Sequence, residues 1–291
     1  MKKKWWVAGA SVGLGAVLLW GVGIPASAGN SGLDIYQEAM KHTKAETSMT
    51  AHVQVEVTDN GKRLATLSGE AKIDRDRQEM SAAGTLEDLV GGKSRSFEAY
   101  REDGSVIVKK GDSDVYQLIE TGGWQKKRED APAAPPVIVE HVHDMMLGHF
   151  RDLSTVESLP DGSKEVDLQL TEEELPFFAN KIAEKFFAKV AEEKQPGESD
   201  IHNVPLQLPK LKQEIEVEQV TLQAKIDRDN RIAGQSAEIH VAGTDERGRK
   251  HELVVKVDVS LSDFSQTQPV HFDPAGKQVE RVSGWRHPAE K

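Results

Sequence analysis

The sequence predicts an α+β fold built around a long antiparallel sheet that consists of two related β-meander units. The first observation is the string Ala-Lys-Ile-Asp-Arg-Asp, which occurs at residues 71–76 and again at 224–229. The second is that each copy follows a β-like run and precedes two further strands joined by a glycine turn. The third is that helix-period segments lie outside these two stretches. The two copies therefore indicate one repeated strand-turn-strand-turn-strand unit.

Residues 29–130 are expected to form a helix followed by the first half of the meander. Apolar residues at helical spacing predict a helix over residues 33–45. Alternation over residues 50–58, followed by Asn60 and Gly61, predicts a strand that enters a tight hairpin turn. Five further strands are expected at residues 64–73, 78–85, 94–101, 106–109 and 115–120.

Residues 131–212 interrupt the sheet with a Pro-rich linker, helices and a hairpin. Proline removes a backbone donor and disfavours helix at the residue before it, so the linker is expected to be extended. A helix is predicted over residues 139–153 and a hairpin from strands at 155–159 and 164–170. A capping-box pattern then opens a helix predicted over residues 171–194. Pro176 falls one turn into it, so a regular helix that begins at Pro176 is the alternative.

The predicted helix at 171–194 carries a stripe of large apolar side chains. They recur at a spacing of three or four residues and are Leu175, Phe178, Ile182, Phe186 and Val190. Such a stripe either packs in an ordinary core or forms the wall of an apolar cavity, and both interpretations stay open. These five residues are the candidate ligand-cavity residues.

Residues 213–280 are expected to form the second half of the meander in the same domain. Its strands are predicted at residues 215–223, 233–242 and 251–260. Residues 281–291 are expected to leave the sheet as a tail.

Residues 1–28 have the parts of a secretory signal peptide. Three lysines precede an uncharged apolar run that begins at Trp5 and ends at Ile24, and small residues stand at Ala26 and Ala28. We expect cleavage after Ala28. The run of about 20 residues is also long enough to span a bilayer, so an N-terminal membrane anchor is the alternative. In both cases the protein is expected to be extracytoplasmic, either secreted or anchored to the outer face of the cytoplasmic membrane.

Composition excludes several classes of protein. The chain has no cysteine, which rules out a disulfide framework and a lipid-modified cysteine. Its net charge is −11, and loss of the three lysines with residues 1–28, which hold no acid, would make it −14. Such a charge argues against nucleic acid as a partner.

The sequence predicts neither a catalytic site nor a metal site nor a cofactor. It has no Gly-x-Ser-x-Gly elbow, no P-loop and no dinucleotide fingerprint. The Asp-Arg-Asp strings of the repeat lack the spacing of a calcium loop and are interpreted as solvated hairpin turns. His141, His143 and Asp144 match no recognised zinc spacing. We therefore expect that the protein is not an enzyme.

Three stretches resemble a known family of exported proteins. They are the run Tyr-Arg-Glu-Asp-Gly-Ser-Val-Ile-Val at residues 100–108, Gly-Gly-Trp at 122–124, and a closing stretch at 264–274 that is similar to the family's final strand. With the order of helix, meander, central helices and second meander, residues 31–280 resemble the LolA/LppX-like proteins, including Firmicutes relatives of undefined function. The resemblance implies a strongly curved antiparallel sheet, a partly open barrel, with helices on its concave side. It also implies a cavity that binds lipids or the acyl chains of lipoproteins.

Two functions are compatible with these observations. The first is a non-enzymatic extracytoplasmic protein that holds an apolar ligand, a lipid or an acylated peptide, between the curved sheet and the helices at 139–153 and 171–194. The second is an extracytoplasmic interaction or sensor domain, tethered to the membrane and with a filled core, whose partner is a membrane or cell-surface protein. A wide cavity favours the first function and a solid interior favours the second.

Overall fold

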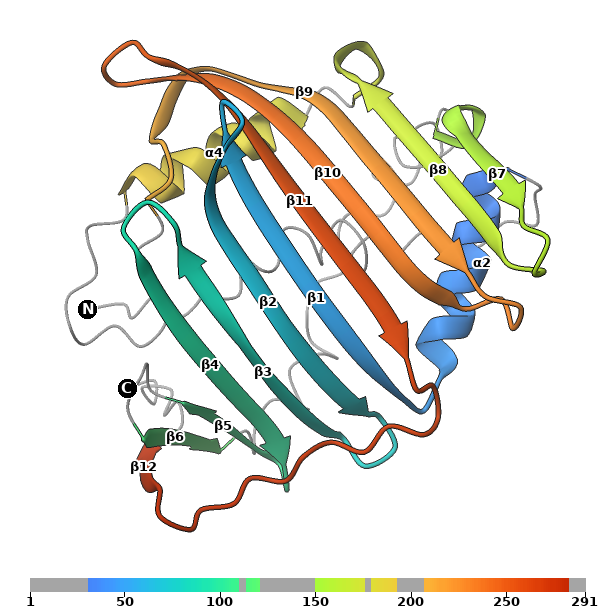
Figure 1. Cartoon of the computed structure of the whole chain (residues 1–291), viewed down its shortest axis with the longest axis vertical. Helices are drawn as coiled ribbons and strands as arrows, with labels where there is room; N and C mark the ends of the chain where they lie inside the picture. The colour runs from blue at the N-terminus through green and yellow to red at the C-terminus, as the bar shows by residue number, and fades with distance from the viewer. Residues whose placement is uncertain (1–30, 110–113, 121–149, 176–178, 193–206, 283–291) are drawn as a thin grey trace, which may run out of the picture.

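A computed structural model describes residues 31–109, 114–120, 150–175, 179–192 and 207–282. These residues form a large, curved, unclosed sheet, and helices α2 (Gly32–Ala45) and α4 (Ala179–Glu192) lie behind it in Figure 1, on its concave side. The predicted α+β fold is confirmed. Within the described residues no helix is long and apolar enough to cross a membrane, and the apolar run that begins at Trp5 lies outside them.

The sheet consists of two meanders placed side by side. The first contains β1 (Ser48–Asp59), β2 (Lys62–Asp74), β3 (Glu79–Asp88), β4 (Lys93–Glu102), β5 (Ser105–Lys109) and β6 (Val115–Glu120). The second contains β7 (Ser154–Ser158), β8 (Lys164–Thr171), β9 (Leu211–Ile226), β10 (Ile232–Asp245) and β11 (Lys250–Ser262). Each meander pairs in chain order, and the two join where β1 runs antiparallel to β11 (Figure 1).

The two copies of the hexapeptide occupy equivalent positions, as the repeat predicts. Residues 71–76 end β2 and enter the turn to β3, and residues 224–229 end β9 and enter the turn to β10. In each turn the first aspartate accepts a backbone N–H of its own turn. The distance is 2.9 Å to Asp74 Oδ1 and 2.8 Å to Asp227 Oδ1. These carboxylates therefore shape the turns in which they lie.

The turn at the other end of β10 has the same construction as the one after β9. Asp227 and Asp245 each accept the backbone N–H groups two and four residues further on. Arg231 Nε and Arg249 Nε lie 2.8 Å from the second oxygen of the same carboxylates. The fourth residue of each turn has a positive φ, 60° for the asparagine and 76° for the glycine. A five-residue pattern, Asp-x-x-Asn/Gly-Arg, thus closes both hairpins of β10.

Helix α2 packs on the concave side of β7, β8, β9 and β10 (Figure 1). Its N-cap is Ser31, whose hydroxyl accepts the backbone N–H of Asp34 at 3.2 Å. Its residues Tyr36 and Ala39 enter a core that the sheet completes with Met49, Val166, Ala224, Ile226, Ile232 and Leu261. Thr43 also accepts the backbone N–H of Ile232 at 2.8 Å, which fixes the end of α2 against the start of β10.

The capping box at Thr171 opens a single 3-10 turn, Glu172–Glu174, instead of the long helix that the sequence predicts. Glu174 Oε2 accepts the backbone N–H of Thr171 at 2.8 Å, so the box itself is formed. Leu175 is extended, with ψ of 144°, because the residue before a proline disfavours the helical region and Pro176 follows. The prediction of one helix over 171–194 is therefore wrong, and α4 begins at Ala179.

The stretch after β11 is a strap along one end of the sheet (Figure 1), whereas the family resemblance implies a final strand over residues 264–274. Side chains hold it: Ser81 Oγ accepts the N–H of Val270 at 2.9 Å, and Phe272 packs against Tyr100 and Tyr116. Prolines 269 and 274 lack the N–H that a strand ladder needs. The chain then rejoins the sheet as β12 (Gln278–Val282), parallel to β6, whereas the sequence predicts only antiparallel pairing.

Candidate ligand-binding face

The two faces of the sheet differ in polarity. On β1, Val53, Val55 and Val57 point to one face, and the alternating polar residues, such as His52, point to the other. Ala51 lies on the valine side and packs against the core that contains α2. The valine side is therefore the concave side, which the helices cover, and the convex side is polar.

Strand β11 extends the apolar face of β1. The register places Val53 opposite Val259 and Val55 opposite Val257. The middle of the face is a small cluster of two buried residues, Ala237 and Val257, and the partly buried Val55, Leu222, Val255 and Val259. Among the described residues no side chain of α2 or α4 belongs to this cluster. The middle of the concave face thus has buried and partly buried aliphatic side chains that lie apart from both described helices.

The structure places the five predicted cavity residues in different settings. Leu175 and Phe186 are partly buried and pack against the core shared by α4 and β9. Ile182 is 51% exposed and belongs to no core cluster of the described residues, so it is not packed in the core as one interpretation of the stripe requires. Phe178 lies outside the described residues, and so does the side chain of Val190, whose backbone belongs to α4.

A polar contact sets the rotation of α4. The register between β9 and β10 shifts near Val217, and Asn180 Oδ1 accepts the N–H of Val217 at 2.9 Å. With Asn180 turned toward β9, the side chains of Ala183 and Phe187 enter the core. The buried stripe of α4 is therefore displaced by one residue from the predicted stripe that passes through Ile182.

An aromatic ring lies over two glycines on the concave face of the first meander. A Cβ atom built on Gly84 would lie 2.5 Å from Phe97 Cζ, and one built on Gly69 would lie 3.2 Å from it. The ring thus fills the space that two missing side chains leave on β2 and β3. It remains 36% exposed. Sequence reasoning missed Phe97, although glycine within two adjacent strands is a signal of such close approach.

A buried amide lies on the same face near α2. The hydroxyl of Tyr36 donates to Gln235 Oε1 at 3.0 Å, which places the Gln235 side chain on the helix side of β10. Gln235 is only 5% exposed, and its Nε2 has no hydrogen-bond partner within the described part of the chain. On α2, Gln37 is also buried, and neither polar atom of its amide has a hydrogen-bond partner among the described residues. Leaving such a group unpaired costs about 1–3 kcal/mol, so these amides need an explanation.

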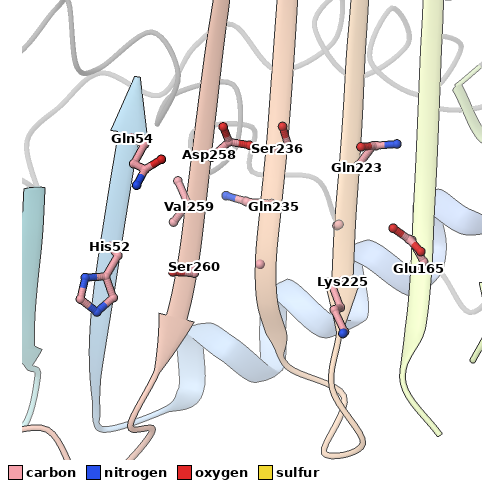
Figure 2. Close-up of a pocket in the computed structure, with 12 residues that line it drawn as sticks. His52, Gln54, Glu165, Gln223, Lys225, Gln235, Ser236, Asp258, Val259 and Ser260 are labelled. Atoms are coloured by element: carbon pink, nitrogen blue, oxygen red, sulfur yellow. The ribbon is translucent and has the colours of Figure 1, made fainter. Parts of the chain in front are cut away.

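A pocket on the convex face is polar, in contrast to the apolar middle of the concave face (Figure 2). It forms over Gly234, where the sheet lacks a side chain, and longer side chains border it. The bordering side chains are polar and include His52, Gln54, Glu165, Gln223, Lys225 and Asp258. Such a lining does not suit an apolar ligand, so the apolar concave face, not this pocket, is the candidate site.

A buried histidine joins two carboxylates where the hairpins β1–β2 and β10–β11 meet. His251 Nδ1 lies 2.8 Å from Asp59 Oδ2, and His251 Nε2 lies 3.4 Å from Asp245 Oδ2. The pKa of Asp245 is held far below its ordinary value, chiefly by the backbone N–H of Arg249 and also by the guanidinium of that residue. Within the described residues no group of three or more His, Cys, Asp or Glu side chains is arranged to hold a metal ion.

Replacing Asp245 by asparagine is expected to destabilise the protein at neutral pH and to weaken its loss of stability in acid. A carboxyl whose pKa is lowered by folding stabilises the fold above its unfolded pKa of about 4, and this stabilisation is lost as the pH falls. Urea unfolding of the wild type and of Asp245→Asn across acidic pH measures the difference. Asp258→Asn, on the convex face, is the matched control. Parallel pH profiles for all three proteins would contradict the prediction.

Comparisons with known proteins do not place the chain in a family. No protein-family model matches it, and no curated protein does. Solved structures that it matches include an acyl-ACP thioesterase from Bacteroides thetaiotaomicron, 8% identical over 88% of this chain and 89% of the other, with a TM-score of 0.14. Another is a 12:0-ACP thioesterase from Umbellularia californica, 11% identical over 88% and 87%, also with a TM-score of 0.14. Scores this low do not show a shared fold, so neither thioesterase bears on the chemistry of this chain.

Proposed function

We propose that the protein is a non-enzymatic extracytoplasmic binding protein that holds an apolar ligand, a lipid or an acylated peptide, against the concave face of its sheet. The observation that carries the proposal is the row of valines on β1 and β11, most of them partly buried, that neither described helix packs against in the middle of the concave face. An apolar lining of this kind, with no side chain of α2 or α4 in it, suits an apolar ligand. Burial of acyl CH₂ groups on this face would contribute about 0.8 kcal/mol each.

The borders of the face also support this function. Helix α2 closes one side of the valine row, α4 packs near the far end of β9, and the exposed ring of Phe97 lies on the first meander. The resemblance to the LolA/LppX-like proteins and the signal-peptide pattern of residues 1–28 point to the same class of ligand and to the same compartment. The class of ligand and the extracytoplasmic compartment are therefore both part of this proposal.

A substitution on each face of one strand tests the proposal. Val55→Gln places an amide among the valines, whereas His52→Gln places the same residue on the convex face of β1. We expect the wild type and His52→Gln to bind the fluorescent fatty acid cis-parinaric acid, and Val55→Gln to bind it about tenfold more weakly or not at all. Fluorescence titration measures the affinity, and circular dichroism confirms that each variant is folded.

Two results would contradict the proposal. The first is that the folded wild type binds no fatty acid, which would favour the membrane-tethered interaction domain with a filled core. The second is that Val55→Gln and His52→Gln bind the probe equally, which would place the ligand elsewhere on the molecule.

A further inference from the structure

The unpaired amide of Gln235 lies at one end of a row of side chains that crosses the concave face. Pairing between successive strands defines this row, because each member is the register partner of the next. In order, the row is Gln235, Val259, Val53, Gly69, Gly84 and Phe97. It therefore runs from a hydrogen-bond donor, over two valines, to an exposed aromatic ring.

The length of the row suits a long-chain amphiphile. Neighbouring strands are about 4.8 Å apart, so the five steps from Gln235 to Phe97 span about 24 Å. This span is comparable to that of an extended long-chain acyl group. The Phe97 ring lies over the two glycines, so beyond Val53 the row presents the exposed ring as a flat apolar surface.

The orientation of Gln235 directs its free N–H groups toward this path. Its Oε1 accepts a hydrogen bond from the hydroxyl of Tyr36 at 3.0 Å. The amide nitrogen, Nε2, has no hydrogen-bond partner among the described residues. Figure 2 shows the amide nitrogen directed away from β9 and toward Val259 on β11. An N–H group of an amide pairs with an acceptor such as a carbonyl or carboxyl oxygen, and it cannot pair with an ammonium group.

We propose that Gln235 Nε2 donates a hydrogen bond to the acyl carbonyl or carboxyl oxygen of a long-chain ligand whose chain lies along the row toward Phe97. This inference rests on the proposed function and narrows it to ligands with an acceptor head group. The apolar ligand is then an acyl compound, either a free fatty acid or an acyl ester, and an alkyl amine is excluded as the preferred ligand. Tyr36 is a positioning residue in this arrangement because it orients the amide.

Three ligands of equal chain length test the proposal on the wild-type protein by displacement of cis-parinaric acid. Palmitate and methyl palmitate carry an acceptor oxygen, and hexadecylamine carries only donors. We expect at least one of the acyl compounds to bind about tenfold or more tightly than the amine. Preference for palmitate alone indicates a free acid, and similar affinity for the ester indicates an esterified acyl chain.

Two variants separate the contribution of the ligand's head group to binding from the contribution of its acyl chain. Gln235→Met keeps the length of the side chain but removes the donor, so we expect the preference over hexadecylamine to fall to about twofold or less while the chain still binds. Gln223→Met makes the same change on the convex face of β9, where Gln223 donates to Asp167 at 2.8 Å, and should leave the preference unchanged.

The outcomes distinguish this inference from the proposed function. If the wild type binds none of the three ligands, the proposed function itself fails. If the wild type binds all three equally, or prefers the amine, the protein still binds an apolar ligand. The hydrogen bond from Gln235 to the head group of that ligand is then contradicted. An unchanged preference in a folded Gln235→Met protein would overturn the inference in the same way. The comparison on the wild type remains decisive even where a variant does not fold.

Discussion

Replacing Phe187 by alanine is expected to lower the free energy of unfolding by about 3–5 kcal/mol, the usual cost of deleting a fully packed ring. Phe187 is 4% exposed, packs edge-on against Phe186 with ring centroids 5.1 Å apart, and belongs to the core that joins α4 to β9. Since this contact carries the attachment of α4, the loss should appear as a shift in the urea midpoint and as weaker protection of α4 in hydrogen exchange.

Ile182→Ala is the matched control, because Ile182 lies on the same helix and is 51% exposed. Its removal creates no cavity, and alanine is the better helix former, so we expect a change within about 0.5 kcal/mol. Losses of equal size at the two positions would show that the helix packs through the stripe predicted from the sequence. That outcome would contradict the rotation set by Asn180 and Val217.

The contrast between these two residues shows which parts of the fold were predictable. The turns that end β2 and β9 were found from the sequence because the groups that shape them lie within four residues of each other. Strand positions followed from alternation, which is also local. The rotation of α4 depends on a contact between Asn180 and Val217, 37 residues apart, and the spacing of apolar residues alone does not encode it.

The candidate site was only partly predictable for the same reason. Apolar alternation on residues 50–58 and 251–260 was visible, but their pairing brings together segments about 200 residues apart. The stripe on α4 was predicted from large apolar side chains at helical spacing, whereas three residues that shape the face interrupt a pattern. Gln235 stands where Ala237, Ile239 and Val241 continue an inward-facing apolar series, and Gly69 and Gly84 leave room for a ring. Breaks in alternation were the signal that sequence reasoning passed over.

The tyrosines are expected to resist ionisation in the folded protein. The chain has three, Tyr36, Tyr100 and Tyr116, and folding raises the pKa of each. Burial is the main cause for all three, and burial together with the neighbouring carboxylates of Glu98 and Glu102 raises the pKa of Tyr100 to about 12. The hydroxyls of Tyr100 and Tyr116 also donate to one carboxylate oxygen, Glu98 Oε2, at 3.0 and 2.9 Å. Ultraviolet titration of the native protein should therefore show no tyrosinate near pH 10, whereas the chain unfolded in guanidinium should titrate at about pH 10.

The same shifts determine how stability changes in alkali. A tyrosine with a raised pKa stabilises the fold fully below its unfolded pKa of about 10, and for Tyr100 this contribution is lost as the pH rises from there to about 12. Glu98→Gln separates the two environments, because it removes the negative charge beside Tyr100 and Tyr116 and leaves the contact between Tyr36 and Gln235 intact. We expect two of the three tyrosines in the folded variant to ionise at lower pH than in the wild type, and the third to be unchanged. Ionisation of all three near pH 10 in the folded wild type would show that neither α2 nor the strap around Phe272 shields these rings from water.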